Sequence, residues 1–160
     1  MPIKAGDRMP AGKFKRMGEK GPEDLTSAQL FDGKRVVLFS VPGAFTPTCS
    51  AKHLPGFIEH AAALRAKGVD TIACMAVNDA FVMNAWGKSA NTADKVLMLA
   101  DGNGEYAKAL GLELDARGFG MGVRGQRFAL VVDNSIATQV LIEAAGEFKV
   151  SAAEYVLAQL

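Results

Sequence analysis

The segment that decides the fold is RVVLFSVPGAFTPTCSAKHLPGF, residues 35–57. It begins with Arg35–Val41, a short apolar run rich in β-branched residues, which predicts a buried strand. A turn with two prolines, Pro42–Thr48, follows the strand, and a helical pattern then spans Cys49–Lys67. Within that pattern Pro55-Gly56 predicts a kink, because proline cannot continue the hydrogen bonding of a helix.

The rest of the chain alternates between strand-like and helix-like segments. Further strands are expected around Lys13–Met17 and at Val69–Val77, Val96–Ala100, Arg127–Val132 and Ala137–Glu143, the last two joined by a hairpin turn at Asp133–Ser135. Helices are expected after a capping box at Thr26–Gln29, at Asp79–Ser89 and Gly104–Leu110, and after a second capping box at Ser151–Glu154, whereas Leu112–Gly125 is expected to be a long glycine-rich loop.

This order of elements indicates an α/β protein in which a central mixed sheet, with a parallel half and an antiparallel edge, is flanked by helices. It suits a thioredoxin-like fold, although other α/β folds share the pattern. No linker or repeat divides the chain, and 160 residues are the length of about one domain. We therefore expect a single domain over residues 1–160.

Composition excludes several classes of protein. The chain is 49% hydrophobic and 22% charged, which is incompatible with disorder, and two cysteines cannot support a disulfide scaffold. A net charge of +1 without charge blocks argues against binding to nucleic acid or to a membrane surface. The longest uncharged stretch, Val36–Ala51, contains two prolines and cannot span a bilayer as a helix. The N-terminus lacks the apolar region of a secretory signal, so we expect a cytoplasmic protein.

Cys49 is the candidate for chemistry. It falls in the first turn of the expected helix, where free N–H groups and the helix dipole favour a thiolate, the nucleophilic form of cysteine. Thr46 lies three residues earlier, close enough for its hydroxyl to donate to the sulfur. Pro42 and Pro47 stiffen the turn by fixing φ, and ligand sites of α/β proteins lie at the carboxyl ends of parallel strands.

The same residues carry a family resemblance. Pro42-Gly-Ala-Phe-Thr46-Pro-Thr-Cys49 resembles the active-site signature of the peroxiredoxins, which is proline, three residues, threonine, two residues and cysteine. Supporting similarity to the type II (type-five) subgroup is found in His53–Phe57, in Ile72–Phe81, around Trp86-Gly87 and in Arg127–Asp133. The resemblance covers the chain nearly from end to end.

The resemblance implies a thiol-dependent peroxidase that reduces hydrogen peroxide or alkyl hydroperoxides, without metal, flavin or haem. Cys49 would be the peroxidatic cysteine and become a sulfenic acid. Thr46 would hydrogen-bond the sulfur and the incoming peroxide, and Pro42 would shield the sulfur from water. Arg127 would place positive charge near the thiolate and the departing oxygen. Arg124 is a nearby competitor, but Arg127 matches the family's strand.

The same resemblance bears on the partners of the protein. It implies a homodimer, with loops near the active site at the contact. Cys74 is expected inside a strand, roughly 10 Å below the sheet edge at which Cys49 lies, which favours core packing over a disulfide. Ser151 stands in the region where some relatives carry a resolving cysteine. We therefore expect an external thiol, glutathione with or without glutaredoxin, to reduce the sulfenic acid, with thioredoxin as the competitor.

The same residues allow other interpretations. Gly120–Gly125 matches a dinucleotide-binding pattern but precedes a strand instead of following one. Cys49 and His53 could face one side of a helix as metal ligands, but His60 is too far along the helix to complete a zinc site, and no further cluster of ligands does so. A cysteine hydrolase with His53 as its base lacks a recognisable third member. A non-catalytic thiol sensor or holdase is the remaining alternative.

Overall fold

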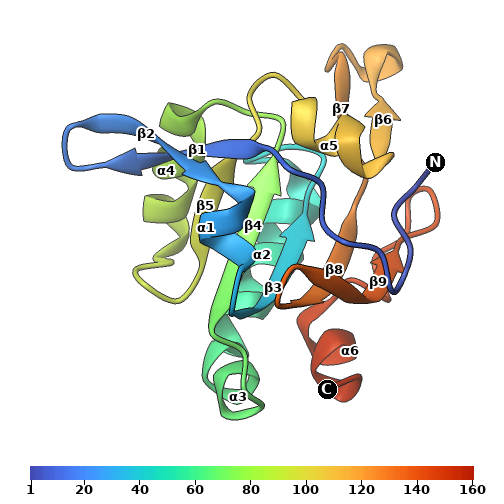
Figure 1. Cartoon of the computed structure of the whole chain (residues 1–160). Coiled ribbons are helices and arrows are strands. Elements are labelled where there is room, and N and C mark those ends of the chain that lie inside the picture. Colours follow the sequence, from blue (N-terminus) through green and yellow to red (C-terminus); the bar gives the residue numbers. More distant parts are fainter.

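The computed structural model describes residues 1–160. Its centre is a seven-stranded sheet with the order β2-β1-β5-β4-β3-β8-β9 (Figure 1). The strands of this sheet are β1 (Lys13–Gly18), β2 (Gly21–Thr26), β3 (Arg35–Ser40), β4 (Thr71–Ala76), β5 (Leu97–Ala100), β8 (Phe128–Asp133) and β9 (Ile136–Ile142). The strands β3, β4 and β5 run parallel, and antiparallel strands extend the sheet on both sides of them. The expected mixed sheet is confirmed, with two antiparallel flanks where one was predicted.

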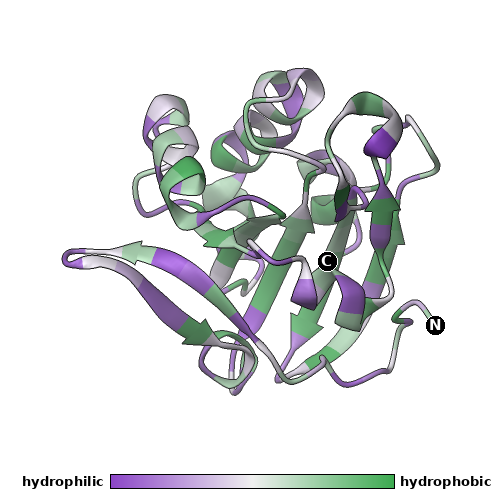
Figure 2. Ribbon diagram, turned by 90° about the horizontal axis from the view of Figure 1, so that it is seen from above, coloured by the Kyte–Doolittle hydropathy of each residue, from purple (hydrophilic) through white to green (hydrophobic).

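Helices cover both faces of this sheet. They are α1 (Ser27–Phe31), the π-helix η1 (Cys49–His53), α2 (Leu54–Glu59), α3 (Ala61–Ala66), α4 (Ala80–Ala90), α5 (Glu105–Leu110) and α6 (Ala153–Ala158). One core cluster joins the sheet to α2, α3, α4 and α6, and a second joins its other face to α1 and α5. Figure 2 shows the apolar central strands between these layers and the polar β1–β2 hairpin projecting from them. None of the helices is both long and apolar enough to cross a membrane.

Local signals in the sequence act as predicted at several element boundaries. The Thr26 side chain accepts a hydrogen bond from the Gln29 N–H, and the Gln29 side chain accepts one from Thr26 in return, which completes the capping box of α1. Asp79 caps α4 in the same way through the N–H of Val82. Asn134 and Ser135 both have positive φ, as the tight turn between β8 and β9 requires.

The predicted kink at Pro55-Gly56 is replaced by two other irregularities. The helix widens into the π-helix η1 in the turn before Pro55, where the N–H of Leu54 donates to the carbonyl of Cys49. The widening accommodates Pro55, which has no N–H to donate and would clash with the carbonyl four residues earlier. A second break falls at His60, which ends α2 and begins α3.

Two further predictions are wrong. Leu112–Gly125 is not a structureless loop but contains β6 (Glu113–Asp115), a 3₁₀ turn η2 (Arg117–Phe119) and β7 (Val123–Gly125), which pair as a small antiparallel sheet. Its strands are too short for their periodicity to be read from sequence. The second capping box does not form either, because Ala152 takes the N-cap position of α6 and the Ser151 hydroxyl bonds to Glu143 instead.

Candidate active site

Cys49 lies at the start of η1, just beyond the loop that leaves the carboxyl end of β3. The loop is anchored at its beginning, where the N–H of Val41 donates to the carbonyl of Met75 on β4. Cys49 itself is fully buried and belongs to the core cluster beneath α2 and α4. The predicted position of this cysteine, in the first turn of a helix at a sheet edge, is confirmed.

Arg127 brings a positive charge to this sulfur. It directly precedes β8, the antiparallel neighbour of β3, and the register pairs Phe128 with Ser40, so that Arg127 stands beside the loop that leads to Cys49. Its Nη2 donates to Cys49 Sγ at 3.0 Å. A guanidinium in this position stabilises a thiolate by charge and by hydrogen bonding. Arg124, the competitor, instead donates to the carbonyls of Met121 and Pro42.

His53 binds the same guanidinium that contacts the sulfur. Its Nδ1 accepts a hydrogen bond from Arg127 Nη1 at 2.7 Å, and its Nε2 lies 3.0 Å from the carbonyl oxygen of Ser151. A guanidinium can only donate, so Nδ1 is unprotonated and Nε2 carries the proton. Burial, together with the charge of Arg127, lowers the pKa of His53 to about 3. The ring is therefore neutral near pH 7.

This arrangement contradicts the use of His53 as the base of a cysteine hydrolase. Such a base must accept a proton from the thiol, yet both ring nitrogens are engaged with Arg127 and Ser151. The same contacts leave no free lone pair for a metal ion. The backbone contradicts the dinucleotide-binding interpretation. Gly120 and Gly122 adopt positive φ in the turn between η2 and β7, and the element that follows them is a strand and not the helix that would bind a pyrophosphate.

Thr46 and Pro42 lie in the loop before Cys49, as predicted, but Thr46 makes a different contact. Its hydroxyl donates to the carbonyl of Gly43 at 2.7 Å, so the expected hydrogen bond to the sulfur is not formed in this structure. Gly43 fits there because a Cβ would come within 3.0 Å of the Thr46 methyl and 3.1 Å of Arg124. The N–H of Ala44 donates to Asn78 Oδ1, which fixes the loop to the segment before α4.

Two residues of the site, Glu143 and Phe148, have no counterpart among the residues predicted from the sequence. Glu143 follows β9 and accepts hydrogen bonds from the N–H of Lys149 and from Ser151, and the ring of Phe148 lies over the Arg127 guanidinium and edge-on to His53. No local pattern identifies them, because each acts through residues that are distant in sequence. The family resemblance includes Trp86 but gives it no role. In the structure its indole N–H donates to the Ser50 hydroxyl at 3.0 Å.

Cys74 lies on β4 opposite Phe39 and is fully buried in the same core cluster as Cys49. Both cysteines are free thiols. Burial, with a smaller contribution from Cys49, raises the pKa of Cys74 well above its ordinary value. A thiol in this state is a poor nucleophile, which fits the predicted packing role.

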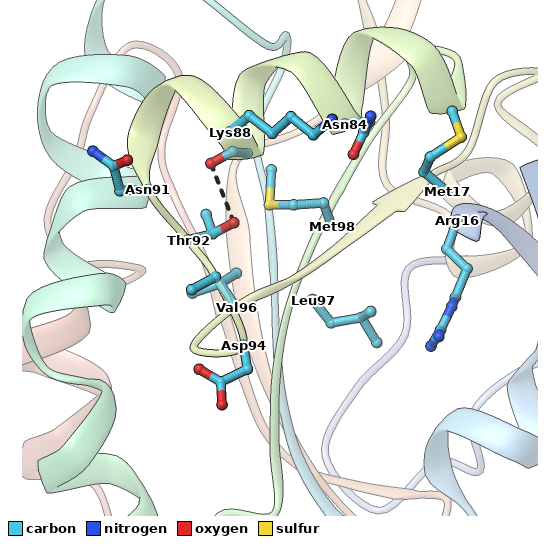
Figure 3. Close-up of a pocket in the computed structure, with 12 residues that line it drawn as sticks. Arg16, Met17, Asn84, Lys88, Asn91, Thr92, Asp94, Val96, Leu97 and Met98 are labelled. Carbon is cyan, nitrogen blue, oxygen red and sulfur yellow. Dashed lines mark hydrogen bonds between the residues drawn. The ribbon is translucent and has the colours of Figure 1, made fainter. Parts of the chain in front are cut away.

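One cavity of the molecule lies away from this site. It measures about 680 Å³ and lies between α4, β1 and β5, with Met17, Val96, Leu97 and Met98 among its apolar lining and Arg16 and Lys88 among its charged residues (Figure 3). None of the site residues described above lines it. This cavity is therefore separate from the buried contacts around Cys49.

Comparison with known proteins agrees with this geometry. The Redoxin family model matches residues 4–157. The chain is 51% identical to Peroxiredoxin-2B of Arabidopsis thaliana over 99% of both chains, and 45% identical to the chloroplastic Peroxiredoxin-2E of that plant over 99% of this chain and 69% of the relative. Among solved structures, reduced Prx3 of Vibrio vulnificus in complex with H₂O₂ has a TM-score of 0.95 and 50% identity over 98% of each chain. These matches confirm the thioredoxin-like fold.

Proposed function

Since the chain belongs to the type II peroxiredoxins and is a thiol-dependent peroxidase, we propose that Cys49 is its peroxidatic residue and that Arg127, Thr46 and Pro42 form the rest of its catalytic site. The observation that carries this proposal is the 3.0 Å contact between Arg127 Nη2 and Cys49 Sγ. It supplies, at the one cysteine of the signature motif, the charge that a thiolate nucleophile needs.

The proposed reaction is a displacement at oxygen. The Cys49 thiolate attacks one oxygen of the hydroperoxide, an S–O bond forms, and the O–O bond breaks. The departing oxygen takes the electron pair of that bond and a proton, and leaves as water or an alcohol, while the cysteine becomes a sulfenic acid. Negative charge thus moves from sulfur to the departing oxygen. A guanidinium beside the sulfur lies next to both positions and stabilises the transition state.

Thr46 and Pro42 have supporting roles in this proposal. The Thr46 hydroxyl donates its hydrogen bond to the Gly43 carbonyl. Its oxygen can therefore still accept a hydrogen bond from a bound hydroperoxide. Pro42 is half-buried, and its carbonyl accepts a hydrogen bond from Arg124 Nη1 at 3.4 Å. Pro42 belongs to the loop between β3 and Cys49, and its proposed role is to shield the sulfur from water.

The reductant is proposed to be an external thiol, with glutathione or glutaredoxin favoured over thioredoxin. Two observations support an external source: Cys74 is enclosed in the sheet, and Ser151 stands where some relatives carry a resolving cysteine. The first external thiol attacks the sulfenic sulfur, forming a mixed disulfide and releasing water. A second thiol then displaces Cys49 as its thiolate and leaves as the oxidised disulfide.

A homodimer is proposed from the aromatic residues around the site. Phe45, Phe81 and Phe119 are 54%, 65% and 84% exposed, and large apolar side chains that are exposed together mark an interaction surface. Phe45 belongs to the Pro42–Thr48 loop, which hydrogen bonds tie to Asn78 before α4 and to Arg124 of β7. The three rings therefore lie on connected segments, and a second copy of the chain would bury them.

The location and extent of the functional unit are proposals as well. A cytoplasmic protein is supported by two free thiols, although one of the relatives above is chloroplastic. A single domain over residues 1–160 is supported by the sheet, which combines strands from near both ends of the chain, and by the match of the family model to residues 4–157.

A stopped-flow experiment tests the proposed roles. Reduced protein is mixed with H₂O₂, and the fluorescence of Trp86, the single tryptophan, reports the oxidation of Cys49. Trp86 senses this change because its indole donates to Ser50, the residue after Cys49. The oxidised protein is then recycled with glutathione and glutaredoxin, or with thioredoxin. We expect oxidation to require Cys49 and to slow in Arg127→Ala, and recycling to proceed with glutathione and glutaredoxin. Full turnover with thioredoxin alone would reverse the reductant assignment.

A further inference from the structure

Behind Arg127, a continuous path of hydrogen bonds runs away from the reactive sulfur to a buried carboxylate. The path leads from Arg127 through the ring of His53 to the carbonyl of Ser151, and the N–H and hydroxyl of Ser151 in turn donate to Glu143. We propose that Glu143 is a positioning residue for the peroxidase reaction, which holds the Arg127 guanidinium on the sulfur through Ser151 and His53. This inference rests on the proposed role of Arg127.

Glu143 closes the segment that connects β9 to α6. Only 8% of the residue is exposed. Its Oε2 accepts hydrogen bonds from the N–H of Lys149 at 2.7 Å, the N–H of Ser151 at 2.8 Å and the hydroxyl of Ser151 at 2.6 Å. Burial alone raises the pKa of this carboxyl, but these hydrogen bonds outweigh it and leave the pKa below its ordinary value. Glu143 is therefore charged near pH 7 and holds Ser151 by two bonds.

The clamp on Ser151 fixes the tautomer of His53. Because the Ser151 carbonyl can only accept, it selects the form of the ring that carries its proton on Nε2. Nδ1 then presents a lone pair to Arg127 Nη1, 2.7 Å away. If Ser151 moved away, water could reach the ring, and either the other tautomer or the imidazolium would place an N–H against the guanidinium.

The guanidinium transmits this restraint to the sulfur because it is planar and rigid. Its two terminal nitrogens lie in a fixed fork, so placing Nη1 on His53 also determines where Nη2 lies. Nη2 donates to Cys49 Sγ at 3.0 Å. The same connecting segment supplies Phe148, whose ring centre is 5.8 Å from the guanidinium carbon. In addition, the N–H of Glu143 donates to the carbonyl of Arg127 at 3.0 Å.

The experiment compares the rate of Cys49 oxidation by H₂O₂ in Glu143→Ala and in a matched control, Glu147→Ala. Glu147 is an exposed acid of the same segment that pairs with Lys149 at the surface. Loss of a residue that orients a metal ligand lowers activity by about 10–100-fold, and by analogy we expect E143A to slow oxidation by about tenfold or more. We expect E147A to react like the wild type.

The pH profile separates positioning from simple destabilisation. With the clamp lost and the ring hydrated, His53 regains an ordinary ionisation, subject to the charge of Arg127 beside it. We therefore expect the rate of E143A, measured below its unfolding temperature, to fall further as the pH drops through about 6.5, where a hydrated histidine titrates, and this acid limb to be absent from the wild type. A residue that only held the segment folded would change the unfolding temperature without adding this limb.

The Arg127→Ala background distinguishes failure of this inference from failure of the proposed function. Because Glu143 acts through Arg127, adding E143A to R127A should cause no further loss of rate. If R127A oxidises at the wild-type rate, the proposed role of Arg127 is wrong. If R127A is slow but E143A reacts like the wild type, or slows R127A as much as it slows the unmodified chain, the positioning role of Glu143 is overturned.

Ser151 provides a gentler test if E143A does not fold. Ser151→Ala removes one of the two bonds that Glu143 makes to this residue, and Ser151→Thr keeps the hydroxyl. The proposal requires S151A to oxidise several-fold more slowly than the wild type and S151T to restore the rate. Equal rates in S151A, S151T and the wild type would overturn it.

Discussion

The first turn of η1 and the middle of β4 each contain one cysteine, and the two could scarcely be more alike in burial. Cys49 and Cys74 are both fully enclosed, both free and both part of one core cluster. They differ in their partners, since Cys49 receives a hydrogen bond from Arg127, whereas no donor is placed on Cys74. Burial alone makes a thiol a poor nucleophile, whereas a half-buried guanidinium beside the sulfur favours the thiolate form.

The comparison also shows how the fold separates packing from chemistry. Residues on β4 are fixed within the sheet and can contact only what packs against it. Cys49 lies beyond the end of β3, where the loop, a helix start and the neighbouring strand β8 converge. Only there can a thiol meet backbone N–H groups and an arginine at the same time.

The largest expected effect comes from exchanging sulfur for oxygen at one of the two positions. Cys49→Ser removes the nucleophile, so peroxide consumption with any thiol reductant should fall by about 10⁴-fold or more. A coupled peroxidase assay measures this loss. Substantial peroxidase activity in C49S would mean that Cys74 or another group carries the reaction, and the contrast drawn above would be wrong.

The next-largest effect is expected when Arg127, the donor that distinguishes Cys49 from Cys74, is removed. Arg127→Ala leaves Cys49 buried without its donor, and the rate of oxidation by H₂O₂ should fall by about 10²–10³-fold. Arg127→Lys keeps the charge but cannot span His53 and Cys49 at once, so its rate should lie between those of R127A and the wild type. Stopped-flow fluorescence measures all three. A wild-type rate in R127A would remove the physical basis of the assignment.

A smaller effect concerns stability in acid. Unfolded His53 binds a proton below its ordinary pKa of 6.5, whereas the folded residue stays neutral until its pKa of about 3. The unfolded state therefore binds more protons in this window, and His53 lowers the free energy of unfolding by about 1.4 kcal/mol for each pH unit of acidification. Glu143, whose folded pKa is also lowered, adds a further loss only below its ordinary value of 4.5.

Urea unfolding between pH 6.5 and 4.5 isolates the contribution of His53. His53→Gln can keep hydrogen bonds to Arg127 and Ser151 but does not titrate, so the stability of H53Q should depend less steeply on pH than that of the wild type. His60→Gln, the same exchange at the other histidine, serves as the matched control. Identical slopes in H53Q and the wild type would show that His53 is not held neutral in the folded protein.

The smallest effect is expected at the second thiol. Cys74→Ala leaves a small cavity in the core and should lower the free energy of unfolding by about 1 kcal/mol, with no change in the rate at which Cys49 is oxidised. Denaturant unfolding and stopped-flow kinetics on the same sample test both statements. A marked loss of turnover in C74A would point to a disulfide between the two cysteines during recycling.

Much of this site could be predicted from sequence because its central segment is local. The apolar run of β3, the proline-bounded turn and the following helix start place Cys49 where the structure has it, and Arg127 follows from the family resemblance. Thr46 shows the limit of such reasoning. Its spacing from Cys49 predicts a hydrogen bond from its hydroxyl to the sulfur. The Gly43 carbonyl lies in the same turn and accepts that hydrogen bond instead.

What could not be predicted depends on contacts between distant segments. The sequence predicts that Ser151 caps α6. Its hydroxyl instead donates to the buried carboxylate of Glu143, eight residues earlier, and Ala152 takes the N-cap position. The π-turn before Pro55 reflects the strain that one proline imposes on a helix, which sequence locates only to within a turn. Strands of three residues, such as β6 and β7, are defined by their pairing and not by periodicity.

Trapping of sulfenic acid tests the central claim most directly. Native protein is exposed briefly to one equivalent of H₂O₂ near pH 7 in the presence of a cyclic diketone that alkylates sulfenic acids, and the labelled peptides are identified by mass spectrometry. The label should be found on Cys49 alone and should largely disappear in R127A under the same exposure. Label on Cys74, or equal labelling of Cys49 with and without Arg127, would contradict the claim that the arginine makes one of two buried thiols reactive.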